Sequence, residues 1–317
     1  MSPFLGKTNS MNWRSHFLIL RILLTLIILV LVFMRVDIDR IGEAFQSIRV
    51  TPFMFAVLLV PVNLLMQMYR WYFILKTADA YTSPKDAFKS ILVGLTFGLI
   101  TPGRIGEVGR SLYIPSSNAI EIVGLVILEK IFSFFTVLIT SALGIIVWGH
   151  EIAGVIVFVC VLFVAFQLNA IRSILSRISF LLPSGKKVAE LWSRWSYFDR
   201  KKIVSLFVIS ICFFLIVYIQ FYILVSSFQG IEVTPALISI PLIIAINSIP
   251  ITVAGLGLRE GASVFFFSKF GVAEAAALNG ALLLFAIDLL IPGLIGLPFT
   301  PKKRFELERL EEEMGHS

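Results

Sequence analysis

Six long apolar segments constrain what this chain can fold into more than any other feature of its sequence. A helix needs roughly 20 mostly apolar residues to cross the hydrocarbon core of a bilayer. Segments of about that length occupy residues 16–34, 53–75, 118–148, 152–169, 203–226 and 274–298. We therefore expect an all-α polytopic membrane protein with about six spanning helices.

Composition agrees with a single membrane domain over residues 1–317. Hydrophobic residues make up 58% of the chain and charged residues only 15%, and no polar stretch is long enough for a second, soluble domain. The formal charge of +7 comes from Lys and Arg clustered beside apolar segments. We read them as topology signals and contacts to anionic lipid head groups, not as a nucleic-acid surface.

The sequence offers no catalytic, cofactor or metal site that we can identify. Its three histidines, His16, His150 and His316, are scattered at or beyond the ends of apolar segments. A nucleophile elbow and a phosphate-binding loop are both absent from the sequence. We therefore expect a protein that is not an enzyme and that uses no cofactor.

Basic residues predict the orientation in the membrane. The loop 171–202 carries eight Lys or Arg residues against only Glu190 and Asp199. The positive-inside rule places such a loop in the cytoplasm, and the basic residues near both ends of the chain agree. We expect a multi-pass protein of a bacterial or archaeal plasma membrane, with both termini cytoplasmic.

Two charged, glycine-bearing breaks interrupt the apolar sequence, at 102–110 (PGRIGEVGR) and 250–261 (PITVAGLGLREG). Irregular backbone and ionisable side chains are tolerated at membrane depth only inside protein or beside a wet cavity. The apolar pieces that flank the breaks, 87–100, 236–249 and 262–270, are too short to cross. We expect each break to belong to a re-entrant hairpin.

With these hairpins, residues 12–148 and 152–300 form two half-repeats of opposite orientation. Each half has the order span, span, hairpin, span. In transporters, interrupted helices at corresponding positions of an inverted repeat point to the binding site. The alternative is that two unrelated loops both contain Gly, Arg and Glu.

The first break supplies Gly103, Arg104, Gly106, Glu107 and Arg110 as candidate substrate-binding residues. The charged residues are spaced by three, so on a helical turn Glu107 pairs with either arginine. An arginine offers a planar donor fork suited to phosphate. The alternative is a cytoplasmic juxtamembrane cluster that obeys the positive-inside rule.

The second break supplies Gly255, Gly257, Arg259 and Glu260. The glycines let the backbone turn tightly or approach a ligand closely. The alternative for the two charged residues is a structural ion pair that caps a broken helix.

Two further acids lie inside expected spans: Glu129, next to Lys130, and Asp288. One acid from each half would then be available to the same cavity. Alternatively, Glu129 and Lys130 lie nearer the interface, where their side chains snorkel.

Polar residues also recur in the second expected span, at Asn63, Gln67 and Arg70, and before the second break, at Asn247 and Ser248. They would line the same cavity in one interpretation. Because hydrogen bonding between helices is the commoner use of Asn and Gln in spans, we leave them out of the core site.

The two breaks carry motifs that resemble those of a known family, the flippase-like transmembrane region of lysylphosphatidylglycerol synthase. Its members carry Pro-Gly-x-x-Gly-Glu-x-x-Arg, which residues 102–110 match, and Gly-x-Gly-x-Arg-Glu-Gly, which residues 255–261 match. The resemblance covers essentially the whole chain. In the best-known relatives this region is implicated in moving a lipid across the bilayer, while a separate soluble domain attaches lysine to phosphatidylglycerol.

The sequence through Ser317 contains no such soluble domain, so the resemblance implies lipid translocation without aminoacyl transfer. The expected substrate is a phospholipid or a lipid-linked or isoprenoid phosphate, with an anionic or zwitterionic head group. The alternatives are a secondary transporter of a small polar solute and a non-transporting accessory subunit. A glycosyltransferase or lipid-synthesis enzyme is a candidate partner, above all if the protein is an accessory subunit.

Overall fold

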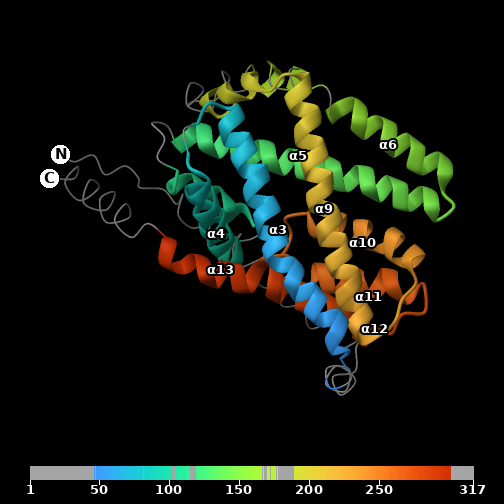
Figure 1. Ribbon diagram of the computed structural model, residues 1–317. Coiled ribbons are helices and arrows are strands. Elements are labelled where there is room, and N and C mark those ends of the chain that lie inside the picture. The colour runs from blue at the N-terminus through green and yellow to red at the C-terminus, as the bar shows by residue number, and fades with distance from the viewer. Residues whose placement is uncertain are drawn as a thin grey trace, which may run out of the picture.

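Long helices dominate the computed structural model, which describes residue 46 and residues 48–300 except 81, 102–103, 115–118 and much of 166–188 (Figure 1). Four helical stretches in this part of the chain are long and apolar enough to cross a membrane. They are α3 (Val50–Thr77), α5 (Ala119–Val147), α9 (Arg200–Phe228) and the continuous stretch Glu274–Phe299. The predicted all-α polytopic membrane fold is confirmed.

The last of these stretches combines four consecutive helical pieces. They are α12 (Glu274–Phe285), the π-helical turn η3 (Ala286–Leu290), α13 (Ile291–Gly296) and the short η4 (Leu297–Phe299). A π-helical turn inside an α-helix is rare and occurs frequently at functional sites. This one contains Asp288, one of the acids singled out from the sequence.

Two of the six expected spans are not among these four helical stretches. The span expected at 16–34 lies outside the described residues. At 152–169 the structure has α6 (Glu151–Ala165), whose 15 residues extend about 22 Å. This is shorter than a perpendicular crossing requires, and the residues that would complete the span are mostly outside the described part.

Each predicted break lies at the junction of two short helices that pack against each other. Around the first break these are α4 (Pro84–Ile100) and the 3-10 helix η1 (Ile105–Leu112); around the second they are α10 (Val233–Asn247) and α11 (Leu258–Ser268). The start of α4 follows from its sequence, because Ser83 accepts a hydrogen bond from the Asp86 amide and Pro84 occupies the first turn.

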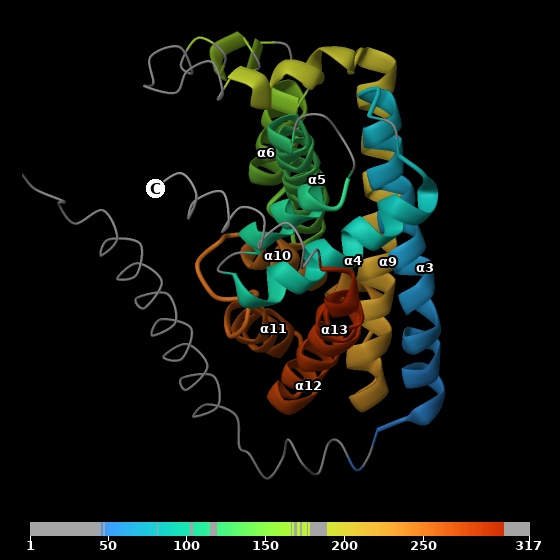
Figure 2. The same cartoon turned by 90° about the vertical axis from the view of Figure 1, so that its left-hand side faces the viewer.

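Helices α3 and α9 pack against each other as an antiparallel pair (Figures 1 and 2). The Arg49 amide donates to the Ser227 carbonyl over 2.8 Å at one end. At the other end the Arg194 guanidinium, in the turn η2 (Ser193–Tyr197), donates to the Ala78 carbonyl over 2.6 Å. This pairing brings Lys76 to the same end as the basic start of α9, as the predicted orientation requires.

The short helices cross over between the two halves of the chain. Helix α4 packs against α13, and α10 packs against α5 (Figure 2). Glycines allow both approaches: a β-carbon on Gly296 of α13 would overlap the Leu92 carbonyl, and one on Gly144 of α5 would lie 3.2 Å from the Ile238 carbonyl oxygen. Small residues at such contacts are typical of membrane helices. The inverted repeat itself stays a prediction.

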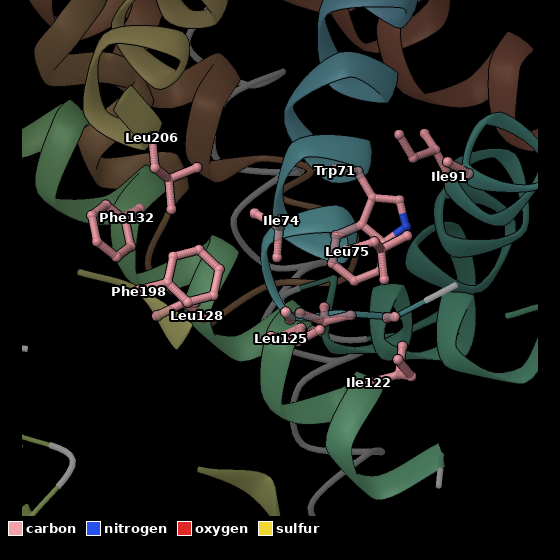
Figure 3. Packing of buried hydrophobic residues seen from close by; sticks show 14 of the residues in the cluster. Trp71, Ile74, Leu75, Ile91, Ile122, Leu125, Leu128, Phe132, Phe198 and Leu206 are labelled. Atoms are coloured by element: carbon pink, nitrogen blue, oxygen red, sulfur yellow. The ribbon is translucent and has the colours of Figure 1, made fainter. Parts of the chain in front are cut away.

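Two apolar clusters hold the bundle together. The first, drawn in Figure 3, joins α3, α5 and the start of α9 around residues such as Trp71, Phe132 and Leu206. The second joins α9 to α10, α11 and α12 around Phe221 and Phe267. The cavity described below has lining residues from both clusters, so a polar site lies where the two clusters meet.

Candidate functional site

A cavity of about 230 Å³ lies between the two breaks. Its lining comes from η1, α10 and α11 and from α3, α5, α9, α12 and the π-helical turn. Six of the eleven predicted site residues line it: Arg104, Glu107, Arg110, Gly255, Arg259 and Asp288. The structure therefore brings together residues that are more than 140 positions apart in the sequence.

The first break turns sharply so that its charged residues face this cavity. Arg104 has a left-handed backbone, with φ of 56°, and η1 begins at the next residue. The Gly106 amide donates to the Thr101 hydroxyl over 2.7 Å, and a β-carbon at Gly106 would overlap the carbonyl of Phe97. Gly106 thus shapes the backbone without lining the cavity, and Gly103 lies outside the described residues.

Glu107 is the centre of an ionic cluster at this break. Its carboxylate forms an ion pair with Arg104 Nε at 2.8 Å and accepts hydrogen bonds from Arg110 Nη2 at 2.6 Å and from Lys130 Nζ. The predicted pairing of Glu107 with an arginine is confirmed, and it involves both arginines at once. Because Glu107 and Arg110 are each 2% exposed, the pair that they form lies inside the protein and not in a solvated loop.

Glu129 extends the cluster to α3 without lining the cavity. One of its carboxylate oxygens accepts from Arg70 Nε at 3.1 Å and Nη2 at 2.6 Å, and the other accepts from Arg110. The Arg70 guanidinium stacks 4.5 Å from the Phe213 ring and the Arg110 guanidinium 5.1 Å from the Trp71 ring. Both arginines are therefore held rigidly by ionic and cation–π contacts.

Arg70 and Lys130 belong to the site although sequence reasoning left them out. Both line the cavity. Arg70 lies near the end of an expected span, where an arginine normally signals topology. The sequence did contain an indication that a basic residue belongs to the site, because a carboxylate buried at mid-span, such as Glu129, requires a cationic partner. Lys130 pairs with Glu107, while the alternative that it snorkels to the interface stays a prediction.

The second break is built on glycines and one buried carboxylate. Gly255 and Gly257 both have positive φ, 76° and 82°, and Gly257 precedes the first residue of α11. The Glu260 carboxylate accepts from the Gly257 amide over 2.7 Å and pairs with Arg259. Glu260 is fully buried behind the cavity, so it positions the turn and the arginine. Arg259 itself lines the cavity, 5.4 Å from the Phe285 ring.

Asp288 and several amides also line the cavity. Asn63 Nδ2 donates to Asp288 Oδ2 and to Gln220 Oε1, both at 3.2 Å, and Gln67 Nε2 donates to Asn63 Oδ1 at 3.0 Å. Asn247 and Ser248 at the end of α10 are further lining residues. The amides that we left out of the core site therefore line the same cavity as the charged motifs.

The charge balance at the cavity favours an anion. Five cationic side chains line the cavity, and four carboxylates line it or pair with these cations. The cations are Arg70, Arg104, Arg110, Lys130 and Arg259, and the carboxylates are Glu107, Glu129, Glu260 and Asp288. Four buried guanidinium nitrogens have no hydrogen-bond partner among the described residues: Arg70 Nη1, Arg104 Nε, Arg110 Nε and Arg259 Nε. The arrangement can therefore donate to a phosphate-like oxyanion.

The same residues do not form a metal centre. Within the described part of the chain, no three His, Cys, Asp or Glu side chains group in a way that could hold a metal ion. The chemistry of the cavity is that of charge-assisted hydrogen bonding.

Comparison with known proteins bears directly on these two breaks. No protein of curated function matches the chain significantly. The family described as the lysylphosphatidylglycerol synthase TM region matches over residues 18–296, a range that contains both breaks and every residue of the cavity. The match covers nearly all of the chain, and we conclude that this protein belongs to the family of the lysylphosphatidylglycerol synthase transmembrane region.

Proposed function

We propose that this protein is a lipid translocase that moves a lipid with an anionic phosphate head group across the plasma membrane. The head group would be that of a phospholipid or of a lipid-linked or isoprenoid phosphate. In this proposal the protein catalyses no covalent step, and both termini lie in the cytoplasm.

The cation-rich cavity supports the anionic head group. Arg259 from the second break and Arg110 from the first both line it, and each retains a buried Nε without a partner in the described structure. A buried donor without a partner is costly, so an oxyanion that accepts from both would be bound favourably. Since the two arginines belong to different halves of the chain, one phosphate would link the halves.

The exposure of two lining residues is the observation that supports the lipid assignment. Lys130 and Phe134 line the cavity, yet the Lys130 side chain is 46% exposed and Phe134 is 42% exposed. They lie about 17 and 23 Å from the start of a helix about 43 Å long, so this exposed part of the lining is near the middle of the helix. A polar cavity with an exposed wall at mid-helix would suit a head group whose acyl chains remain in lipid.

Movement would follow from the crossed packing of the short helices. Each pair of short helices carries one arginine-bearing break and packs against the last helix of the other half. A ligand can shift a conformational equilibrium only if it contacts the two states differently. A phosphate shared by the two breaks would contact the two states differently, because opening the cavity on either side would change the distance between Arg110 and Arg259.

Leaflet exchange in liposomes tests the proposal. The purified protein is reconstituted with fluorescent phospholipid and polyprenyl-phosphate probes, and loss of fluorescence on adding a membrane-impermeant quencher is followed. Arg259→Gln should abolish most of the exchange. Arg194→Gln is the matched control, because Arg194 is paired with Glu121 over 2.5 Å and does not line the cavity.

Two results would overturn the proposal in favour of its rivals. Counterflow of a water-soluble anion with no lipid exchange would indicate a solute transporter. Full function of Arg259→Gln in cells, together with loss of function when residues 172–188 are deleted, would indicate an accessory subunit that acts through its basic loop.

A further inference from the structure

Asp288 differs from the other carboxylates at the cavity because it has no ion pair. Glu107, Glu129 and Glu260 each pair with an arginine. In the described part of the chain, no Lys or Arg nitrogen forms such a pair with Asp288, and its contact is with an amide: Asn63 Nδ2 donates to Asp288 Oδ2 over 3.2 Å. A carboxylate at membrane depth without a cationic partner is costly to keep ionised, and intramembrane acids of this kind often serve in proton relays.

We propose that Asp288 binds a proton at Oδ1 and that the protein moves one proton together with each anionic phosphate head group. This inference rests on the proposed function, because it names the energy source for the same movement. The proton would come from the solution on one side of the membrane, occupy Asp288 while the head group is bound, and leave to the solution on the other side. One proton and one phosphodiester monoanion together carry no net charge.

The oxygen that would receive the proton has no other role in the described structure. Asp288 Oδ1 is a buried atom without a hydrogen-bond partner among the described residues, whereas Oδ2 accepts from Asn63. Asp288 also lines the cavity, so water or ligand in the cavity reaches it. The residue lies in the π-helical turn Ala286–Leu290, and such turns inside α-helices occur frequently at functional sites.

The groups around Asp288 are arginines and amides. Arg259 of α11 and Arg104 before η1 act on it electrostatically without forming an ion pair in the described structure. Helices α12 and α13 carry no charged residue from 275 to 299 other than Asp288, and α4 meets α13 through apolar side chains such as Leu99. Because arginines stay charged and amides stay neutral, Asp288 is the one of these groups whose charge can change. The polar groups from the remaining packed elements are Asn63, Gln67 and Arg70 of α3 and Gln220 of α9.

A phosphate in the same cavity would couple its own binding to that proton. In a round cavity of about 230 Å³, two charges lie about 8 Å apart, a separation at which one negative charge weakens the binding of another about 30-fold at an effective dielectric constant of about 20. Protonation of Asp288 removes this repulsion, and by linkage the bound anion strengthens proton binding by the same factor. Proton and anion would therefore cross in the same direction.

The equilibrium distribution of a lipid between the leaflets of liposomes with an imposed pH gradient tests the coupling. The probe is fluorescent phosphatidylglycerol, a phosphodiester monoanion, and valinomycin with equal potassium on both sides removes the membrane potential. One proton per lipid predicts about tenfold enrichment in the leaflet that faces the more alkaline solution, for a gradient of about one pH unit. Protein-free liposomes give the background. A membrane potential without a pH gradient should produce no enrichment.

Asp288→Asn cannot take up the proton, so the equilibrium enrichment should fall from about tenfold to less than about twofold, whatever the rate of exchange. Arg194→Gln is the matched control and should keep the enrichment, because Arg194 does not line the cavity. Should Asp288→Asn fail to fold, Asp288→Glu replaces it; this variant retains a carboxyl and should keep the enrichment.

Infrared spectroscopy of the protein in liposomes tests the proton site without transport. Exposed carboxylates stay ionised from about pH 6 to about pH 9, so a protonated-carboxyl band that disappears over this range belongs to a protected acid. We expect this band in the wild type and in Glu274→Gln, and expect it to be absent from Asp288→Asn. Glu274 begins the same helical stretch and does not line the cavity.

The outcomes separate this inference from the proposed function. Lipid exchange by the wild type without enrichment under a pH gradient would overturn the proton inference and leave the translocase intact. Enrichment that persists in Asp288→Asn would also overturn it, because another group, such as Lys130, would then carry the proton. An infrared band that depends on Asp288, without any lipid exchange, would support the proton site and overturn the translocase.

Discussion

Replacing Glu129 by Gln tests the claim that a buried carboxylate holds the two basic elements together. Glu129 is 2% exposed, and its two oxygens bind Arg70 and Arg110. In the variant, Arg110 keeps Glu107 at 2.6 Å, whereas Arg70 loses its carboxylate while its side chain is 7% exposed. Breaking a buried pair in this way costs about 3–5 kcal/mol of unfolding free energy.

A double-mutant cycle isolates this effect. Arg70→Met in the Glu129→Gln background removes the uncompensated charge and leaves Arg110 with Glu107. The double variant should therefore be less destabilised than the sum of the two single variants, by about 2–3 kcal/mol. Equilibrium unfolding in mixed micelles, followed by tryptophan fluorescence, measures each variant; Trp71 and Trp195 are fully buried and report on the first cluster. Additive single effects, within about 0.5 kcal/mol, would refute the reasoning.

Three further predictions concern backbone and surface positions and use the same unfolding assay. Gly255→Ala and Gly271→Ala place alanine at nearly the same φ, 76° and 75°, but only a β-carbon at 255 would also overlap a side-chain atom. Gly255→Ala should therefore lower the free energy of unfolding by about 1–3 kcal/mol more than Gly271→Ala does; equal losses would contradict the overlap. Gly296→Val should separate α13 from the Leu92 carbonyl of α4 and lower the melting temperature strongly; a neutral result would show that the approach is not needed. Glu121→Gln breaks a partly exposed pair and should cost at most about 1 kcal/mol, and a larger loss would assign this pair a structural role.

The long helices were predictable because segment length and apolarity are local properties. Residues 53–75, 118–148, 203–226 and 274–298 are helices within a few residues of the expected ends. The two breaks were predictable for the same reason, since proline, glycine and charge interrupt an apolar run at one place. In the structure one short helix ends before each break and the next begins within it.

Contacts between distant residues were not predictable in the same way. One of the two arginine partners of Glu129 is Arg70, which lies 59 positions earlier, and the local sequence of neither segment indicates that the two residues meet. The π-helical turn at Asp288 is also invisible in the sequence, because residues 286–290 continue an apolar pattern. Gly144 and Gly296 read as ordinary small residues until the crossed packing of α10 and α4 shows why a side chain would not fit.

Reversible blockage of the cavity tests the central claim most directly. Ser133 lines the cavity on α5, and a Ser133→Cys variant without the native Cys160 and Cys212 can be labelled by a bulky disulfide-forming reagent. Lipid exchange is measured in the same liposomes before labelling, after labelling and after reduction; Val155→Cys, exposed on α6, is the control. We predict that labelling at position 133 stops exchange and that reduction restores it. Unchanged exchange with the label in place would contradict a lipid pathway through this cavity.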